Sequence, residues 1–293
     1  MNDKIENLLE ENRKFSPKTE LTQNANATSE WFDDANENRL EFWKKQALER
    51  ITWFKEPSEI LDDSNPPFFK WFKDGELNLS YNCLDRHLET DSERVAFYWE
   101  GEPGDTQEIT YQDLYERVCR LSNALKKLNV KKGDRVAIYL GMTPEIVVAM
   151  LACARIGAVH SVVFGGFSSE ALADRINDAK AKLVITADGA WRRGDIVPLK
   201  DNVDGSLELT DYIDNVIVVK RTNQDIEMKQ GRDHWYHEIT EKEQPVCEPE
   251  IMNAEDMLYI LYTSGTTAKP KGIVHTQAGY LTGVTTTHHE VFD

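Results

Sequence analysis

Residues 262–272 read YTSGTTAKPKG and contain the residue types that bind phosphate groups. The hydroxyl donors and positive charges of this stretch belong to Thr263, Ser264, Thr266, Thr267, Lys269 and Lys271. Gly265 lets the backbone turn and bring its N–H groups close to an anion. An apolar run over residues 257–261 comes immediately before and predicts a buried strand. The stretch therefore predicts a phosphate-binding loop at the end of a strand.

The spacing of this loop excludes a Walker A motif. That motif requires a lysine followed by a hydroxyl residue, whereas Lys271 is followed by Gly272 and Ile273. A surface turn with two solvated lysines would explain TSGTT alone. The PKG sequence at residues 270–272 and the preceding apolar run favour phosphate binding over that simpler explanation.

A glycine turn forms a second candidate site. Gly165 and Gly166 follow a predicted strand at residues 161–164 and precede a helix for which Ser168 is the N-cap. Turns in this position, between the carboxyl end of a strand and a helix N-terminus, bind anions and cofactors in α/β proteins. A tight turn without a ligand also explains the glycine pair taken alone.

An arginine-containing turn forms a third candidate site. The sequence ADGAWRRGD at residues 187–195 follows a predicted strand at residues 183–186 and carries Arg192 and Arg193. These arginines could bind phosphate, or they could pair with neighbouring carboxylates on a solvated turn, and the residue types favour neither. The carboxylates in question are Asp188 and Asp195.

Alternating strands and helices must position these turns. Strands are predicted at residues 95–99 and 136–140. A helix begins after Thr110, with Asp113 in the capping-box position, and a second helix begins at Thr143 before a proline in its first turn. This alternation predicts an α/β fold with a doubly wound sheet.

Three regions are predicted along the chain. Residues 1–28 are polar and predict a flexible extension. Residues 29–88 predict a small helical and irregular lobe, in which aromatic residues between Trp31 and Trp53 recur at the spacing of one amphipathic helix. Residues 89–293 predict the α/β domain.

The composition excludes several kinds of partner. A formal net charge of -17 argues against nucleic acids and anionic membrane surfaces. No apolar run is long enough to cross a bilayer, and the N-terminus is too charged for a signal peptide, so a cytoplasmic location is expected. The four cysteines lack metal-ligand spacing, and no metal site is predicted.

Several stretches carry a resemblance to a known enzyme family. The string TSGTTAKPKG resembles the TSG[ST]TGxPKG signature of adenylate-forming enzymes, which include acyl-CoA synthetases, luciferases and peptide-synthetase adenylation domains. The sequences SVVFGGFS at residues 161–168 and TADGAWRRGDIVPLK at residues 186–200 narrow the resemblance to acetyl-CoA and propionyl-CoA synthetases. The resemblance extends from Glu30 to the end of the chain and includes WFDDANENRLEFW, which is similar to the N-terminal lobe of that family.

The resemblance implies the chemistry of an AMP-forming acetate–CoA ligase. Such enzymes join a short carboxylate to ATP, usually with Mg²⁺, release pyrophosphate, and transfer the acyl group from the adenylate to the thiol of CoA. Lys271 would then contact the departing pyrophosphate. The cradle around the ATP phosphates would comprise Thr263, Ser264, Gly265, Thr266 and Thr267, with Lys269 beside it. The partners would be small-molecule substrates, without nucleic acid or membrane.

The resemblance also implies that the two other turns contact CoA, the arginines through its phosphates. The CoA turn would comprise Gly166, Arg192, Arg193, Gly194 and Asp195. Asp195 stands where the family often has a second arginine, and its carboxylate would repel phosphate at close range. Either Arg193 substitutes from its neighbouring position, or the affinity for the 3′-phosphate end of CoA is lower. Ala268 stands where the family usually has glycine, and it would be strained if that position requires a positive φ.

Much of the family's active site lies beyond the position of Asp293. The acyl pocket, the adenine and ribose contacts, the metal-binding acidic residue and the mobile C-terminal domain all come later in such enzymes. We therefore expect the chain to be the N-terminal part of a longer enzyme and to be inactive alone, with its oligomeric state undetermined. A propionyl or other short-acyl synthetase is the first alternative, and a non-catalytic nucleotide- or CoA-binding fragment is the second.

Overall fold

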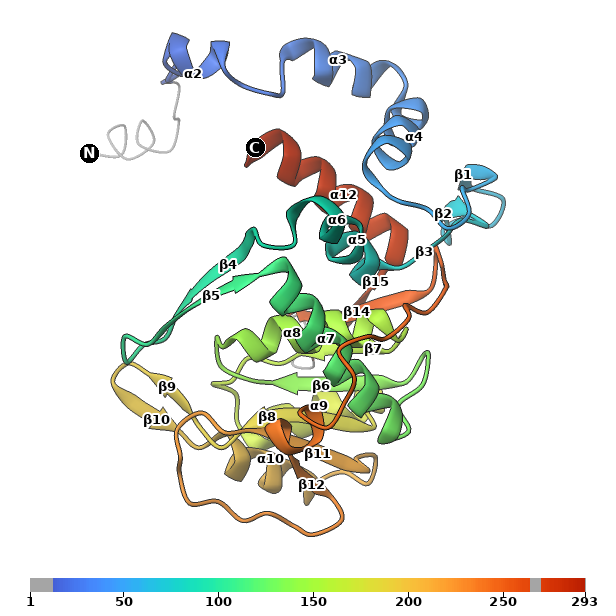
Figure 1. Ribbon diagram of the computed structural model, residues 1–293. Coiled ribbons are helices and arrows are strands. Elements are labelled where there is room, and N and C mark those ends of the chain that lie inside the picture. Colours follow the sequence, from blue (N-terminus) through green and yellow to red (C-terminus); the bar gives the residue numbers. More distant parts are fainter. Residues whose placement is uncertain (1–12, 264–269, 293) are drawn as a thin grey trace, which may run out of the picture.

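A seven-stranded sheet lies at the centre of the larger part of the molecule (Figure 1). The computed structural model describes residues 13–263 and 270–292. The strand order is β12-β11-β8-β6-β7-β14-β15, and every neighbouring pair is parallel except β14 and β15. The strands are β6 (Arg135–Tyr139), β7 (Val159–Val162), β8 (Leu183–Ala187), β11 (Asn215–Val219), β12 (Asp233–Trp235), β14 (Met257–Thr263) and β15 (Lys271–Thr276). Every residue of β8 is buried, because helices cover both faces of the sheet.

The connections between the strands make the sheet doubly wound. The helices are α7 (Tyr111–Lys127), α8 (Pro144–Arg155), α9 (Ser169–Ala179), α10 (Leu199–Leu207), α11 (Tyr236–Thr240) and α12 (Gln277–Val291). Strand β6 leads through α8 to β7, and β7 leads back through α9 to β8 on the other side of β6. Because such crossovers are right-handed, α8 and α9 lie on opposite faces. The predicted α/β fold is confirmed, and its topological switch point lies at the carboxyl ends of β6 and β7.

One predicted strand lies outside this sheet. Strand β4 (Val95–Glu100) pairs only with β5 (Thr106–Thr110) in an antiparallel hairpin that stands apart from the central sheet in Figure 1. The prediction of a strand at residues 95–99 is therefore confirmed, but its place in the doubly wound sheet is wrong. Alternating apolar and polar residues predict that a strand forms, but they do not identify the strand with which it pairs.

The N-terminal helices differ from the single amphipathic helix predicted between Trp31 and Trp53. The chain forms α2 (Thr19–Gln23), then α3 (Ser29–Glu37) and α4 (Arg39–Arg50). Asn38, with φ of -141° and ψ of 81°, separates the last two, and its side chain accepts a hydrogen bond from the Glu41 N–H. A capping side chain at this position begins a second helix and ends the first. Trp53 lies beyond α4.

Short elements connect these parts. They are β1 (Glu59–Asp62) paired with β2 (Lys70–Lys73), β3 (Glu76–Leu77) paired with β13 (Met252–Asn253), β9 (Ala190–Arg192) paired with β10 (Asp195–Val197), the helices α5 (Leu79–Cys83) and α6 (Leu88–Asp91), and the 3₁₀ turn η1 (Asp85–His87). An ion pair of 2.6 Å between Arg50 and Glu290 joins α4 to α12. Across the described ranges, none of the helices has the length and apolar character needed to span a bilayer.

Local sequence signals place the helix ends correctly. Thr110 and Asp113 form the predicted capping box at the start of α7. Ser168 accepts a hydrogen bond from the Ala171 N–H at the start of α9, as predicted for an N-cap. Cys119 of α7 and Cys153 of α8 are fully buried in the core cluster beneath these helices. Side-chain caps therefore fix the starts of α7 and α9, and burial fixes α7 and α8 against the core.

Candidate functional site

A cavity of about 640 Å³ opens at the switch point, and we call it the switch-point cavity. It is lined by residues 140–143 after β6, residues 162–166 at the end of β7, the β9–β10 hairpin, residues 100–102 at the tip of the β4–β5 hairpin, and Arg221 after β11. Ligands of open α/β sheets bind where the loops from two neighbouring strands diverge in this way. The glycine turn and the arginine turn predicted from the sequence both contribute to it.

The structure brings Gly166 and Arg192 into direct contact. The Arg192 guanidinium carbon lies 4.7 Å from the centre of the Phe164 ring. A Cβ atom at Gly166 would overlap the same guanidinium group, so only glycine leaves room for it there. Arginine stacked on an aromatic face keeps its outer N–H donors available for a phosphate. The arrangement is therefore suited to holding a phosphorylated ligand that also stacks.

The arginine turn is a two-residue hairpin loop. Arg193 and Gly194 both have positive φ, of 55° and 83°, and Arg192 pairs with Asp195 across the hairpin. Gly194 tolerates this conformation readily, whereas a side chain at Arg193 costs some strain. The Gly194 N–H donates to the carboxylate of Glu102. Arg193, Gly194 and Asp195 do not line the cavity themselves.

The alternative in which the arginines pair with Asp188 is not the arrangement found. Within residues 13–263 and 270–292, no ion pair joins Arg192 or Arg193 to a carboxylate. Asp188 is almost fully buried and instead accepts hydrogen bonds from four backbone N–H groups, those of Gly189, Arg221, Thr222 and Asn223. It therefore fixes the loop after β11 against the end of β8.

Sequence reasoning missed Arg221, which lines the cavity, and Trp99, on which Arg221 packs. Arg221 binds Asp105 through both terminal nitrogens, at 2.6 and 3.0 Å, and its guanidinium carbon lies 5.0 Å from the centre of the Trp99 ring. Trp99 donates its indole N–H to the Met142 carbonyl at 2.8 Å. These contacts hold the β4–β5 hairpin over the cavity. The sequence alone gives no local signal for these contacts.

The two described ends of the predicted phosphate loop, Thr263 and Lys271, lie at the carboxyl end of β14, one strand away from β7. Strand β14 is parallel to β7, and Thr263 at its end lies opposite Lys271, the first residue of β15. Both are exposed. The other predicted members of the loop lie outside the described residues: Ser264, Gly265, Thr266, Thr267 and Lys269, together with Ala268.

The strands that carry this loop are less buried than predicted. Leu261 of β14 keeps 48% of its surface exposed, and Ile273 of β15 keeps 47%. The prediction of a strand at residues 257–261 is confirmed, but its complete burial is wrong. An apolar run predicts that a strand forms, but it does not predict what covers the outer face of that strand. Strands β14 and β15 form one edge of the sheet, so this face stays partly exposed.

A stack of side chains links the two regions. The Arg175 guanidinium lies 4.4 Å from the centre of the Phe167 ring, in the glycine turn, and 5.5 Å from that of Tyr262, just before the phosphate loop. The Tyr262 hydroxyl donates to Asp178 at 2.7 Å. Burial, followed by this carboxylate, raises the pKa of Tyr262, so its hydroxyl stays protonated and continues to donate.

A buried histidine lies between the same two strands. His160 of β7 is opposite Tyr259 of β14, and their rings are stacked with centres 5.6 Å apart. Burial lowers the pKa of His160 to about 4, because the interior disfavours its charged form. The side chain is therefore neutral near pH 7 and contributes packing, without a charge for catalysis.

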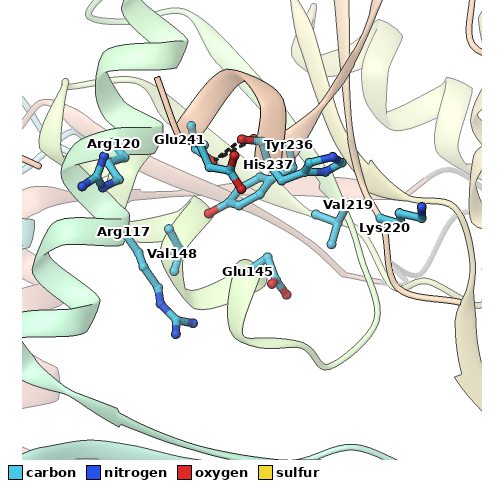
Figure 2. A pocket seen from close by; sticks show the side chains of 10 residues that line it. Arg117, Arg120, Glu145, Val148, Val219, Lys220, Tyr236, His237 and Glu241 are labelled. Carbon is cyan, nitrogen blue, oxygen red and sulfur yellow. Dashed lines mark hydrogen bonds between the residues drawn. The ribbon is translucent and has the colours of Figure 1, made fainter. Parts of the chain in front are cut away.

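A second cavity, of about 480 Å³, lies between α7, α8 and α11 (Figure 2). Arg117 and Arg120 from α7, Glu145 from α8, Lys220 after β11 and Tyr236 from α11 line it. Arg117 donates to Gln107, and Arg120 donates to the Glu243 carbonyl. Charges of both signs alternate around the opening, and the sequence analysis singled out none of these residues. The switch-point cavity is therefore the better candidate.

The chain is similar to known proteins along its whole length. A family model described as AMP-binding enzyme matches residues 84–293, and one described as acetyl-coenzyme A synthetase N-terminus matches residues 28–83. Proteins named acetyl-coenzyme A synthetase are 57% identical in Streptomyces avermitilis and 55% identical in Streptomyces coelicolor, each over the whole chain. One from Pasteurella multocida is 53% identical over 98% of the chain. The chain spans 45% of the length of each of these relatives.

Proposed function

Because the chain belongs to the family of AMP-binding enzymes, we propose that it forms the N-terminal part of an AMP-forming acetate–CoA ligase. The enzyme would convert ATP, acetate and CoA into acetyl-CoA, AMP and pyrophosphate through an acetyl adenylate. One structural observation carries the CoA half of this proposal: Gly166 and Arg192, far apart in sequence, meet in the switch-point cavity. The names of the relatives support acetate as the acid.

In the first half-reaction, an acetate oxygen attacks the α-phosphorus of ATP and pyrophosphate leaves. Negative charge accumulates on the departing pyrophosphate, so fixed cations and donors near it lower the barrier. The position of Lys271 supports assigning it this role, since it begins β15 directly opposite Thr263. We assign Lys271 to the pyrophosphate, and Thr263 with Ser264, Gly265, Thr266, Thr267 and Lys269 to the phosphate cradle.

In the second half-reaction, the CoA thiol attacks the acetyl carbonyl and AMP leaves. The switch-point cavity would hold the phosphorylated end of CoA, with Arg192 on a phosphate and Gly166 leaving room for the guanidinium group. The backbone N–H of Gly194, which donates to the Glu102 carboxylate, would become available to the ligand only when that carboxylate moves away. Arg193 and Asp195 belong to the same turn and would act from its outer side.

Mg²⁺ is expected to accompany ATP in this reaction. In the part of the chain that the structure describes, there is no group of three or more His, Cys, Asp or Glu side chains that could hold a metal ion. The family resemblance puts the metal-binding acidic residue beyond the position of Asp293, so we assign no Mg²⁺ ligand among the described residues and no step through Mg²⁺. A cytoplasmic location and small-molecule partners belong to the same proposal, because the reaction consumes ATP and CoA.

ATP–pyrophosphate exchange tests the proposal. The assay is run with acetate, with propionate and without acid, on the 293-residue chain and on the natural gene product that contains it. We expect acetate-dependent exchange in the natural gene product and none in the 293-residue chain. Faster exchange with propionate would change the substrate to that acid.

CoA binding separates the enzyme from a non-catalytic binding module. We expect the natural gene product to bind CoA and to form acetyl-CoA once adenylate is present. CoA binding without acid-dependent exchange under any condition would contradict the ligase and favour the binding module. If the natural gene product showed no CoA binding and no exchange, both the ligase and the binding module would be contradicted.

A further inference from the structure

Glu102 occupies a donor of the arginine turn. Its side chain comes from the tip of the β4–β5 hairpin, lines the switch-point cavity and accepts a hydrogen bond from the Gly194 N–H. The carboxylate of Glu102 is exposed and, among the residues that the structure describes, has no Lys or Arg within ion-pair distance. An anion from the protein itself is thus bound at the turn that was predicted to bind a ligand's phosphate.

The hairpin holds Glu102 in this place. Arg221 anchors the hairpin through Asp105, and Trp99 anchors it through the Met142 carbonyl. A Cβ atom at Gly101 would overlap Asp105 and would lie 2.5 Å from Arg221, so the backbone before Glu102 is tightly packed. The backbone of the hairpin is therefore fixed, whereas the exposed Glu102 side chain is free to rotate away.

A carboxylate and a phosphate compete for the same donor. Both accept hydrogen bonds from backbone N–H groups, and both carry negative charge, so they repel each other when they are close. Asp195 is directly opposite Arg192 in the hairpin and adds a second negative charge to the turn. A phosphate that approaches Arg192 must therefore displace Glu102 from Gly194 or bind beside two carboxylates.

We propose that Glu102 is a specificity-determining residue that accepts a hydrogen bond from the Gly194 N–H and thereby weakens the binding of phosphate-bearing ligands. This inference rests on the proposed CoA site. It makes the affinity for CoA depend on how easily one carboxylate leaves the turn. A ligand without phosphate groups would not encounter this competition.

Binding measurements with three ligands test the inference in the natural gene product. The ligands are CoA, dephospho-CoA, which lacks the 3′-phosphate, and pantetheine, which lacks all phosphates. Glu102→Gln removes the charge but keeps an acceptor of the same shape, and we expect it to tighten CoA binding about three- to tenfold, the range of one weakly screened charge–charge contact. Pantetheine binding should not change. An effect on CoA alone identifies the 3′-phosphate as the competitor, and equal effects on CoA and dephospho-CoA identify the diphosphate.

Two further variants complete the test. Glu102→Asp keeps the charge but shortens the side chain. It should therefore tighten CoA binding less than Glu102→Gln does. Glu108→Gln removes an exposed carboxylate from β5 of the same hairpin, away from the cavity, and should change none of the three affinities. Thermal unfolding confirms that each variant is folded.

The outcomes distinguish this inference from the proposed function. Wild-type binding of CoA with an unchanged affinity in Glu102→Gln would overturn the role of Glu102 and leave the CoA site in place. An equal gain for pantetheine would overturn it as well, because no phosphate would be involved. The absence of CoA binding in both proteins would overturn the proposed function and, with it, this inference.

Discussion

The switch-point cavity and the β14–β15 hairpin differ in how their residues are brought together. The cavity joins residues from the loops after β6, β7 and β11 and from two hairpins, and buried contacts such as those of Asp188 hold it. The hairpin joins Thr263 and Lys271, which are eight positions apart and exposed. The first site depends on long-range contacts, and the second depends on local sequence.

This difference separates the effects expected from substitutions. In the β14–β15 hairpin, Lys271 carries a single charge, so its removal should affect only the step that releases pyrophosphate. In the cavity, Arg192 rests on Phe164 and Gly166, so a change in any of them alters the position of the others. Four predictions test this distinction, from the largest expected effect to the smallest.

Lys271→Ala should have the largest effect. Loss of a fixed positive charge at the departing pyrophosphate should slow acetate-dependent ATP–pyrophosphate exchange about 100- to 1,000-fold, while the affinity for CoA stays unchanged. Exchange rates and CoA binding are measured in the natural gene product. Lys242→Ala, which removes another exposed lysine, is the matched control. Equal losses in exchange and CoA affinity would show that the two regions are one site.

The free energy of unfolding should depend on pH through His160, which packs between the two regions. Its pKa in the folded chain is about 4, below the ordinary histidine value of 6.5, so the unfolded chain binds more protons between these values. The free energy of unfolding should therefore fall by about 3 kcal/mol as the pH is lowered from about 6.5 to about 4. Above pH 6.5 this contribution is complete.

Urea unfolding of His160→Phe at several pH values checks this effect. The variant lacks the titrating group, so its free energy of unfolding should fall less steeply below pH 6.5 than that of the wild type. His237→Asn, at an exposed position, should retain the wild-type slope. Parallel curves for the wild type and His160→Phe would assign the acid sensitivity to other groups.

Arg192→Ala should raise the KM for CoA about 10- to 150-fold and leave adenylate formation unchanged, because a charge-assisted contact to phosphate contributes about 1.5–3 kcal/mol. Steady-state kinetics with varied CoA measure the first quantity, and pyrophosphate exchange measures the second. Arg193→Ala removes the neighbouring charge, which lies outside the cavity lining. A larger effect of Arg193→Ala would mean that this residue supplies the phosphate contact.

Gly166→Ala should have the smallest effect, raising the KM for CoA about three- to tenfold, because the new methyl group displaces a flexible guanidinium group. Gly283→Ala is the matched control, since a Cβ atom there meets no neighbour within 4 Å. The same kinetic assay applies to both. Combined with Arg192→Ala, the Gly166→Ala effect should largely disappear, because the two residues act through one contact. Additive effects would contradict the packing of Arg192 on Gly166.

Much of the fold followed from local patterns in the sequence. The caps at Thr110 and Ser168 and the apolar runs of β8 and β14 identified helix starts and strands at the right positions. The aromatic periodicity was less reliable, because Asn38 interrupts it with a cap. Such signals are short-range, and each reports the conformation of a few neighbouring residues.

The candidate site was only partly accessible to the same reasoning. The glycine and arginine turns were identified by composition, but their contact through Gly166 and Arg192 could not be derived from their spacing. Arg221, Trp99 and Glu102 gave no usable signal, since their roles arise from the position of the β4–β5 hairpin over the cavity.

The sequence by itself determined the element types, the helix caps, the phosphate-loop motif and the family resemblance. The tertiary structure decided that β4 lies outside the central sheet and that one outer strand pair remains half-exposed. It also decided which side chains surround the switch-point cavity. The physical reason is that hydrogen bonds and periodicity act over a few residues, whereas strand order and the pairing of distant charges depend on the packing of the whole chain.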